Sequence, residues 1–298
     1  MYFGFLNVMK PPGMTSHDVV ARLRRLTKIK RAGHGGTLDP LAEGVLPMAV
    51  GQACRLIDYL PSDKSYYAEI LLGKKTTTDD LEGEVVEEKE TAHITCEQIE
   101  NALDQFRGQI KQHPPVYSAI RIGGQHLYDL ARQGKAPEKA PERTVIVHEL
   151  EIVFIKPPLV AIRVHCSKGT YIRSLARDLG DCLGTGGCLS KLIREKAGLM
   201  TLSNSLSLDA IKDLIDKNEW QSLFTDLAIA LGFEKVELDQ PDAENVFHGR
   251  AIELVSKNGE SGRFLLGIQN GVYIALLKEL ENGYGKPEVV FSDARVST

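Results

Sequence analysis

The chain has 298 residues, of which 43% are hydrophobic and 26% are charged. This composition is typical of a globular protein with a substantial core, and it argues against disorder, collagen-like repeats and a small disulfide scaffold. No apolar run approaches the roughly 20 residues that a membrane helix needs. The first ten residues also lack the basic start and the small-residue cleavage site of a secretory signal. We therefore expect a cytoplasmic protein without a membrane partner.

The net charge of -4 is unevenly distributed along the chain. Residues 1–60 carry eight Lys or Arg against four Asp or Glu, and residues 105–198 carry fifteen against eight. Acidic residues dominate the segments 79–104 and 199–298 instead. Two basic segments on one face would suit an anionic ligand such as a nucleic acid, although charge alone does not demonstrate one.

The five cysteines include no Cys-x-x-Cys pair. An odd number of cysteines without a secretory signal favours reduced, mostly buried thiols over disulfides, and it gives no support to a zinc site. We predict that the protein holds no metal.

The first predicted elements are a strand and a helix. Residues 2–8 are apolar and aromatic enough for a buried strand, and residues 10–13 end it. Thr15, followed three residues later by Asp18, predicts a capping box, and the apolar residues after it recur at helical spacing. Six of the ten residues 22–31 are Lys or Arg, which is more than the helix dipole requires.

Residues 33–47 contain four glycines and two prolines, so we expect an irregular, tightly folded loop rather than a helix or a central strand. Loops of this kind on a scaffold often carry function. Asp39 lies in the loop, and two interpretations remain open: it caps a local turn, or it is a catalytic carboxylate. For His34, a structural role competes with that of a general base.

Alternating apolar residues predict a strand over 66–73, and the acidic segment after it reads as a solvated surface with a helix near 95–104. Residues 114–144 are rich in glycine and proline and carry cations beside tyrosines. This pattern suits single-stranded nucleic acid, but it also suits a plain surface loop. Strands are expected over 144–155 and 159–166.

A further helix is predicted after Gly169-Thr170, with Tyr171 and Arg173 close to its N-terminus. Arg173 would either pair with a carboxylate or face water. A helical stretch near 207–231 follows. Residues 233–298 read as short strands separated by glycines, as in a small barrel or sandwich, and we place a domain boundary near 232.

Several common catalytic motifs are missing from the sequence, namely the P-loop, the Gly-x-Gly-x-x-Gly fingerprint, the Gly-x-Ser-x-Gly elbow and the His-Glu-x-x-His motif. Nucleotide hydrolysis, dinucleotide redox chemistry, serine-esterase and zinc-protease activity therefore lose their main support. No motif indicates a cofactor, and we expect none.

One segment resembles a known family. Residues 33–40, followed by 44–47, are similar to the signature of the TruB family of pseudouridine synthases, which isomerise the uridine at position 55 in the T loop of tRNA. Other segments resemble the same family: 10–16, 63–66, 114–119, 128–134 and 166–173. The resemblance implies an α+β pseudouridine synthase fold with a largely antiparallel sheet and a central cleft. It implies a catalytic domain over 1–232, with a tRNA-clasping insertion at about 114–144, and a β-rich PUA-like RNA-binding domain over 233–298.

The resemblance also assigns catalytic roles to three residues. Asp39 matches the catalytic aspartate, which acts either as a nucleophile or as a base. Arg173 matches the arginine that pairs with it, and Tyr66 matches the tyrosine that stacks on the target base and handles the proton at C5. No cofactor is implied, because the reaction involves no net redox change.

Four further residues match positions that bind substrate. His34 corresponds to the histidine that probes the T loop and helps to evict the uridine, and Leu192 to a leucine that lines the base pocket. Lys64 and Tyr171 belong to the matching Lys-x-Tyr and arginine motifs. Two positions near Leu192 depart from the family pattern: Ile193 stands where arginine is common, and Cys188 where histidine is common.

These features predict a monomeric enzyme that flips a base out of the T arm of tRNA and needs no cofactor. Two alternatives remain: a tRNA-folding chaperone that retains the fold, and the catalytic subunit of a guide-RNA complex. The basic insertion and the short C-terminal segment favour the stand-alone enzyme. We expect the insertion to be mobile without RNA and to become ordered on binding.

Overall fold

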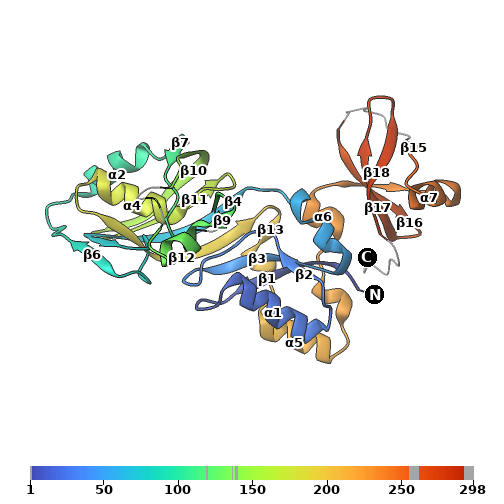
Figure 1. Ribbon diagram of the computed structural model, residues 1–298, viewed down its shortest axis with the longest axis horizontal. Helices are drawn as coiled ribbons and strands as arrows, with labels where there is room; N and C mark the ends of the chain where they lie inside the picture. Colours follow the sequence, from blue (N-terminus) through green and yellow to red (C-terminus); the bar gives the residue numbers. More distant parts are fainter. Residues whose placement is uncertain (1, 119, 136, 138–139, 255–261, 292–298) are drawn as a thin grey trace. The chain divides into compact units, whose positions relative to one another are not determined.

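The computed structural model describes residues 2–118, 120–135, 137, 140–254 and 262–291 (Figure 1). The chain divides into two compact units. The first, here called the terminal unit, contains residues 1–61 and 197–298. The second, here called the middle unit, contains residues 62–196.

The terminal unit combines helices with two groups of strands. Its strands are β1 (Gly4–Lys10), β2 (Ala32–His34), β3 (Glu43–Val50), β13 (Met200–Thr201), β14 (Glu234–Glu237), β15 (Ile252–Glu253), β16 (Phe264–Gln269), β17 (Val272–Glu279) and β18 (Tyr284–Val290). Its helices are α1 (Ser16–Thr27), α5 (Leu208–Asp216), α6 (Leu227–Leu231) and α7 (Gln240–Phe247). Short 3-10 turns are η1 (Gly51–Arg55), η2 (Ile57–Tyr59), η3 (Leu202–Asn204) and η4 (Trp220–Leu223).

Strand β3 lies between β1 and β2 and pairs antiparallel with both. Both faces of these strands are buried, because alternate residues enter different cores. Leu46 and Met48 of β3 join the core beneath α1 and α5, whereas Val45 and Ala49 join a second core on the opposite face. These two cores fix the strands that lead into the loop carrying Asp39.

The second core continues into the C-terminal strands. Phe3 and Phe5, which flank the start of β1, belong to the same buried cluster as Leu266, Tyr273 and Phe291. The C-terminal sheet has the order β14-β16-β17-β18-β15, as expected for a small β-rich, PUA-like domain. The boundary near 232 stays a prediction.

A polar network joins helix α6 to this C-terminal sheet. Asp226 caps α6 by accepting from the backbone N–H groups of Ala228 and Ile229, and it also accepts from the Tyr273 hydroxyl at 2.7 Å and from Lys235 at 3.0 Å. Burial raises the pKa of Asp226, but the hydrogen bonds from Tyr273 and Lys235 outweigh it and leave this pKa below its ordinary value. Burial and the Asp226 carboxylate raise the pKa of Tyr273 to about 12.

The middle unit is built on a sheet of order β12-β4-β11-β10-β7. Its strands are β4 (Lys64–Leu72), β5 (Lys74–Thr76), β6 (Val85–Glu88), β7 (Gly108–Gln112), β8 (Arg121–Ile122), β9 (Gln125–His126), β10 (Arg143–Lys156), β11 (Leu159–Cys166) and β12 (Gly187–Ala197). Its helices are α2 (Cys96–Asp104), α3 (Leu127–Arg132) and α4 (Ile172–Cys182). Strands β4, β11, β10 and β7 pair antiparallel in that order.

The structure confirms the predicted α+β class with a largely antiparallel sheet, the capping box at Thr15 and the alternation in β4, whose even-numbered residues from Tyr66 are buried. It also confirms the strands over 144–155 and 159–166 to within one residue at each end. The predicted helical stretch over 207–231 is broken into α5, a 3-10 turn and α6.

The prediction that 33–47 is entirely irregular is wrong at both ends, because residues 33–34 belong to β2 and residues 43–47 belong to the central strand β3. Proline is tolerated there for a local reason. The Pro47 carbonyl accepts from the Gly35 N–H at 2.8 Å, just where β2 ends, so the missing N–H of Pro47 also points to that side. No hydrogen bond to β1 is lost.

The description of residues 233–298 as strands alone is also wrong, because α7 occupies 240–247. Its start signal is visible in the sequence. Asp239 caps the helix by accepting from the Asp242 N–H, and Pro241 stands in the first turn, where proline is favoured. Among the described residues, none of the helices has the length and apolar character needed to cross a membrane.

The Asp226 network predicts a pH-dependent contribution to stability. Asp226→Ala should lower the free energy of unfolding at pH 7 by about 1 kcal/mol, a Tm decrease of about 2–4 °C. Asp226→Asn should lower the free energy of unfolding by a smaller amount, because the amide oxygen of asparagine can still accept the hydrogen bonds that cap α6. Since the folded pKa is depressed, the charge of Asp226 stabilises the protein above the unfolded pKa, and this effect disappears as the pH falls through the folded pKa.

Thermal unfolding of wild type and Asp226→Asn between pH 7 and pH 3 measures this effect. The Tm difference between them should shrink on acidification. Asp216→Asn, which removes an exposed carboxylate from α5, should change Tm little at any pH. A constant difference between wild type and Asp226→Asn would show that the carboxylate charge contributes nothing.

Candidate functional site

The loop that carries Asp39 is clamped to the first turn of α1. The buried Ser16 hydroxyl donates to the Leu38 carbonyl at 3.1 Å and accepts from the Leu38 N–H at 2.9 Å. One hydroxyl therefore satisfies both backbone groups of the residue before Asp39. The Asp39 side chain itself is partly exposed, so this clamp holds a reachable carboxylate in one place.

A buried cation holds the other side of the same loop. The Lys10 side chain has no exposed surface, and its ammonium donates to the carbonyls of Pro11 at 2.9 Å, Met14 at 2.6 Å and Pro40 at 3.3 Å. The Pro40 carbonyl also accepts from the Gly13 N–H at 2.8 Å. Segments 10–14 and 39–40 are thus tied together through backbone carbonyls, which fixes the backbone on both sides of Asp39.

His34 lies at the end of β2, before the glycine pair of the loop. Its Nδ1 accepts from the Gly36 N–H at 3.4 Å, so in the neutral ring the proton resides on Nε2, which is then a donor. The ring meets His17 of α1 edge to face, with 5.9 Å between centroids. At Gly35, an added Cβ would lie 2.7 Å from Cδ1 of Leu60, so a larger residue there would require the Leu60 side chain to move.

In the middle unit, Tyr66 and Lys64 project from the start of β4. Tyr66 is only 7% exposed and pairs with Val164 of β11. Lys64 is half-buried, and its ammonium donates to the Ser62 carbonyl. Burial, together with the nearby Arg194 guanidinium, lowers the pKa of Lys64.

Arg173 is a buried guanidinium in the first turn of α4. It donates to the Thr78 carbonyl and to the Tyr117 carbonyl, each at 3.0 Å, and it lies 3.6 Å from the Asp80 carboxylate. The turn that contains Asp80 is itself bound to Leu189 of β12. The middle unit therefore orients Arg173 through two loops that are distant in sequence.

Tyr171 caps the start of α4 and exchanges hydrogen bonds with Gln112. The Tyr171 N–H donates to the Gln112 side chain at 3.1 Å, and the Gln112 amide donates to the Tyr171 carbonyl at 3.3 Å. The Tyr171 ring packs against the buried Ile120 and Leu127. In the described structure, Tyr171 thus makes contacts that support the insertion, and its predicted role in substrate binding stays a prediction.

Leu192 is buried in β12, as is Arg194, whose side chain has no exposed surface. Cys188, one of the two departures from the family pattern, is buried in the same strand. The five cysteines are free, and Cys96 and Cys182 are exposed, so the expectation of mostly buried thiols is only partly met. Burial raises the pKa of Cys166 and of Cys188 to about 11, which makes both poor nucleophiles at neutral pH.

The predicted site residues fall into two groups. Asp39 and His34 share one loop of the terminal unit, whereas Tyr66, Lys64, Tyr171, Arg173 and Leu192 belong to the middle unit. Sequence reasoning missed Lys10, Ser16 and His17 around the first group and Asp80 near the second. A polar serine one residue after the capping Thr15 is a weak signal for Ser16, because helix starts commonly carry serine.

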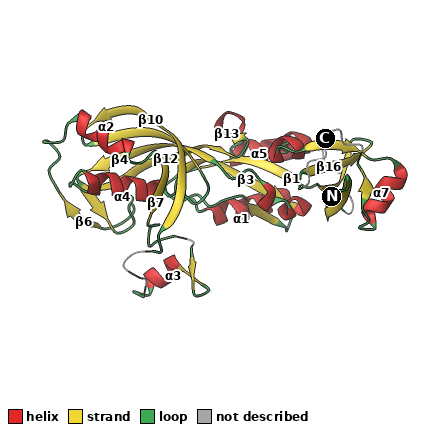
Figure 2. Ribbon diagram, turned by 90° about the horizontal axis from the view of Figure 1, so that it is seen from above, coloured by secondary structure: helices red, strands yellow, loops and turns green. Residues whose placement is uncertain are grey.

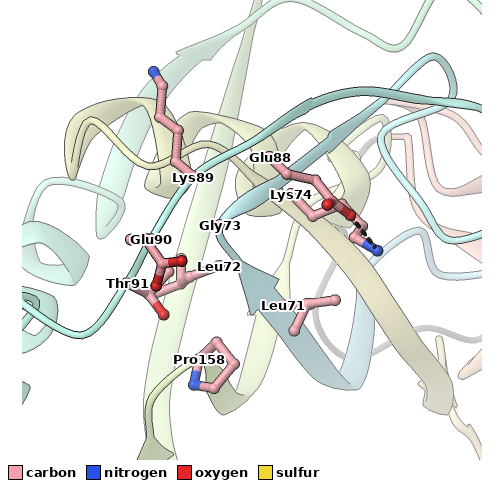
Figure 3. Close-up of a pocket in the computed structure, with 9 residues that line it drawn as sticks. All are labelled: Leu71, Leu72, Gly73, Lys74, Glu88, Lys89, Glu90, Thr91 and Pro158. Carbon is pink, nitrogen blue, oxygen red and sulfur yellow. Dashed lines mark ion pairs between the residues drawn. The ribbon is translucent and has the colours of Figure 1, made fainter.

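Two cavities lie in the middle unit as the structure describes it. One, of about 470 Å³, is bordered by the ion pair between Lys74 and Glu88, 2.9 Å apart, and by Pro158 (Figure 3). The other, of about 250 Å³, lies beside Arg177 and His113. None of the predicted site residues lines either cavity. Among the described residues, no group of three or more His, Cys, Asp or Glu is arranged to hold a metal ion.

The two hydrogen bonds between Ser16 and Leu38 predict a measurable contribution to the free energy of unfolding. Ser16→Ala should lower the free energy of unfolding by about 1–3 kcal/mol, because it leaves the buried N–H and carbonyl of Leu38 without a partner. Denaturant unfolding of wild type and variant measures this cost. Ser222→Ala, which removes an exposed hydroxyl from the same unit, is the matched control and should be neutral. Equal stability of all three proteins would contradict the clamp.

Comparison with known proteins relates this site to a family. The profile of the TruB family pseudouridylate synthase (N terminal domain) matches residues 24–172. A protein of Synechocystis sp. named tRNA pseudouridine synthase B is 47% identical over 85% of this chain and 86% of its own length. A protein of Trichormus variabilis with the same name is 40% identical over 97% of this chain and 98% of its own.

Among solved structures, an H/ACA ribonucleoprotein bound to a substrate RNA containing 2'-deoxyuridine includes a similar chain. It has 25% sequence identity and a TM-score of 0.72, and the match covers 97% of this chain and 85% of that one. The loop signature around Asp39, the family profile and the relatives of nearly full length agree. The chain therefore belongs to the TruB family of pseudouridine synthases.

Proposed function

We propose that this protein isomerises uridine to pseudouridine in tRNA, at position 55 of the T loop. The observation that carries the proposal is the pinned loop at residues 38–40, where Ser16 and Lys10 fix the backbone around the partly exposed Asp39. Relatives that cover most of the chain at 40% to 47% identity are named tRNA pseudouridine synthase B, which supports both the reaction and the substrate class.

The chemistry needs one carboxylate and no cofactor. The bond between C1' of the ribose and N1 of uracil breaks, the uracil turns, and a new bond forms from C1' to C5. The proton leaves C5, and the released N1 gains one, so atoms and electrons balance without an oxidant or reductant. We assign the carboxylate to Asp39, which acts either on the sugar or base as a nucleophile or on a sugar proton as a base.

Five other residues complete the proposed site. Arg173 pairs with Asp39, because a carboxylate enclosed with a flipped base needs a cation to remain ionised. Tyr66 provides the flat ring on which the uracil stacks. His34 fills the space that the base leaves. Leu192 and Lys64 line the base pocket.

The remaining parts of the proposal concern the whole molecule. Residues 1–232 carry catalysis, the insertion at about 114–144 holds the T arm, and residues 233–298 form a PUA-like domain that contacts RNA. We propose that the enzyme acts as a cytoplasmic monomer. Size-exclusion chromatography with light scattering, with and without tRNA, tests the oligomeric state.

Asp39→Asn should abolish isomerisation while tRNA affinity stays within about threefold of wild type, because the substitution removes charge but hardly any volume. The measurement is tritium release from a tRNA transcript labelled at uridine C5, combined with a filter-binding assay. A transcript with cytidine at position 55 is the substrate control and should release no tritium from wild type.

Turnover by Asp39→Asn would refute the assignment of Asp39. Tritium release that persists with the position-55 control would refute the target. Tight tRNA binding by wild type without any release would favour a tRNA-folding chaperone or an enzyme that needs a guide-RNA partner.

The basic end of α1 predicts a salt-dependent contribution to binding. Arg25 and Lys30 are exposed there, and Arg25→Gln/Lys30→Gln should reduce the slope of log affinity against log salt by about 1.5 if both contact phosphates. The rate of the chemical step at saturating tRNA should not change.

Lys212→Gln/Lys217→Gln, in α5 and at its C-cap, is the matched control, because it removes the same charge from the same unit. Binding of tRNA is measured between 50 mM and 300 mM salt for wild type and both variants. Equal slopes for the two double variants would show that the α1 cations act only through net charge.

A further inference from the structure

Arg177 is a cation of α4 that the proposed catalytic set does not use. Its guanidinium contacts two carboxylates, Asp79 at 2.9 Å and Asp178 at 2.8 Å. It also donates to the backbone carbonyl of His113 at 2.9 Å. All three partners lie in the middle unit, and the side chain of Arg177 is only 22% exposed.

His113 stands at the point where the chain leaves β7 for the insertion. Segment 113–117, here called the insertion root, is held to α4 by side chains that donate to its carbonyls. The His113 carbonyl accepts from the Ser174 hydroxyl at 2.8 Å as well as from Arg177. The Tyr117 carbonyl accepts from Arg173 at 3.0 Å. Three polar residues on one side of α4, namely Arg173, Ser174 and Arg177, thus donate to carbonyls of the root.

The root and the residue after it also contact other parts of the described insertion. The His113 ring bonds through Nδ1 to the carbonyl of Ala140 at 2.9 Å, where the insertion returns to β10, and this nitrogen must be the donor because a carbonyl can only accept. Farther along, the Tyr128 N–H of α3 donates to the Ser118 carbonyl at 3.1 Å. Helix α3, which stands clear of the sheet of this unit in Figure 2, is therefore connected to α4 through the root.

Helix α3 and the residue before it present a cationic and aromatic stack. The rings of His126 and Tyr128 are parallel within 15° with 5.1 Å between centroids, and the Arg132 guanidinium lies 5.6 Å from the centre of the Tyr128 ring. Rings and guanidinium planes of this kind suit the bases and phosphates of RNA. The position of this stack depends on the segment that leaves the root, through Ser118, and on the packing of Tyr171 against the cluster that contains Leu127.

The root is held by polar contacts across an open space. A cavity of about 250 Å³ lies between the root and α4, bordered by His113, Val116 and Arg177 among others. Without Arg177, the Ser174 hydroxyl would be the remaining side-chain donor to the His113 carbonyl among the described contacts. Removing two carboxylates and a guanidinium from water also costs free energy, and an apolar cluster of similar volume would stabilise the fold as well or better. Stability alone therefore does not explain this cluster.

We propose that Arg177 is a positioning residue. It fixes the root to α4 and thereby determines the position and orientation of the insertion that binds RNA. This inference rests on the proposed function in that the insertion's ligand is tRNA. Arg177 contacts neither the target base nor the reacting atoms in this scheme. Its removal should weaken tRNA binding and leave the chemical step intact.

The test compares Arg177→Met with wild type and with Arg163→Met. The control removes an arginine of the same unit that pairs with Glu195 at 3.3 Å and has no contact with the root, so bulk charge is matched. Arg177→Met should raise the tRNA Kd about tenfold, the loss expected for one charged hydrogen bond. Its single-turnover rate at saturating tRNA should change by less than about twofold. Arg163→Met should change neither.

Two further measurements separate positioning from a general loss of structure. Hydrogen exchange in residues 120–135 of the RNA-free protein should be faster in Arg177→Met, with exchange in β4 and β11 unchanged. Tyr128→Leu should cost less tRNA affinity in the Arg177→Met background than in wild type, because the stack is already misplaced. An unchanged Kd, unchanged exchange in 120–135, or fully independent losses in the double variant would each overturn the proposal.

If Arg177→Met does not fold, Ser174→Ala serves instead, because it removes the other donor to the His113 carbonyl and leaves the charged cluster intact. It should weaken tRNA binding in the same direction, and wild-type affinity would count against the root's role. The exchange measurement needs no RNA. Failure of wild type to act on tRNA would therefore refute the proposed function while the exchange data still decide whether Arg177 fixes the insertion.

Discussion

A buried cation must be surrounded by acceptors, and this constraint organises both groups of site residues. Lys10 meets it with three backbone carbonyls from segments 11–14 and 40, and Arg173 meets it with the carbonyls of Thr78 and Tyr117 and the nearby Asp80. Irregular chain segments can satisfy such cations only in one arrangement. The loops that carry the proposed site residues are therefore held in place although they have little regular structure of their own.

Local signals predicted the elements that hold these loops. The capping box at Thr15 and the alternation from Tyr66 depend on residues within a few positions, and both are present. Pro47 misled the prediction, because its tolerance in β3 depends on where β2 ends, which the sequence does not mark. The contacts that fix the backbone beside Asp39 could not be predicted from the sequence either. Ser16 and Leu38 are 22 residues apart, and no sequence motif pairs a serine with a leucine at that distance. The roles of Asp39 and Arg173 came from family resemblance, not from spacing.

The C-terminal strands share a core with the strands that support Asp39. Phe5 and Ala49 pack in the same cluster as Leu276 and Phe291. The predicted boundary near 232 rests on the change from a helical pattern to short strands separated by glycines. The sequence does not indicate that residues on both sides of this position are buried in one core. In energetic terms, the C-terminal sheet contributes apolar area to the scaffold of the loop that carries Asp39, so the stability of the sheet and that of the loop are linked. A role in RNA binding would be added to this structural one.

Helix α4 links recognition to chemistry in the proposed mechanism. Arg173 and Arg177 are four residues apart, so their side chains leave the helix on the same side. One reaches the Tyr117 carbonyl and the other the His113 carbonyl, at the two ends of the insertion root. Any displacement of the root by bound RNA would act on both guanidinium groups. Because Arg173 is also the proposed partner of Asp39, the grip on the tRNA and the orientation of the catalytic pair would then depend on the same turn of helix.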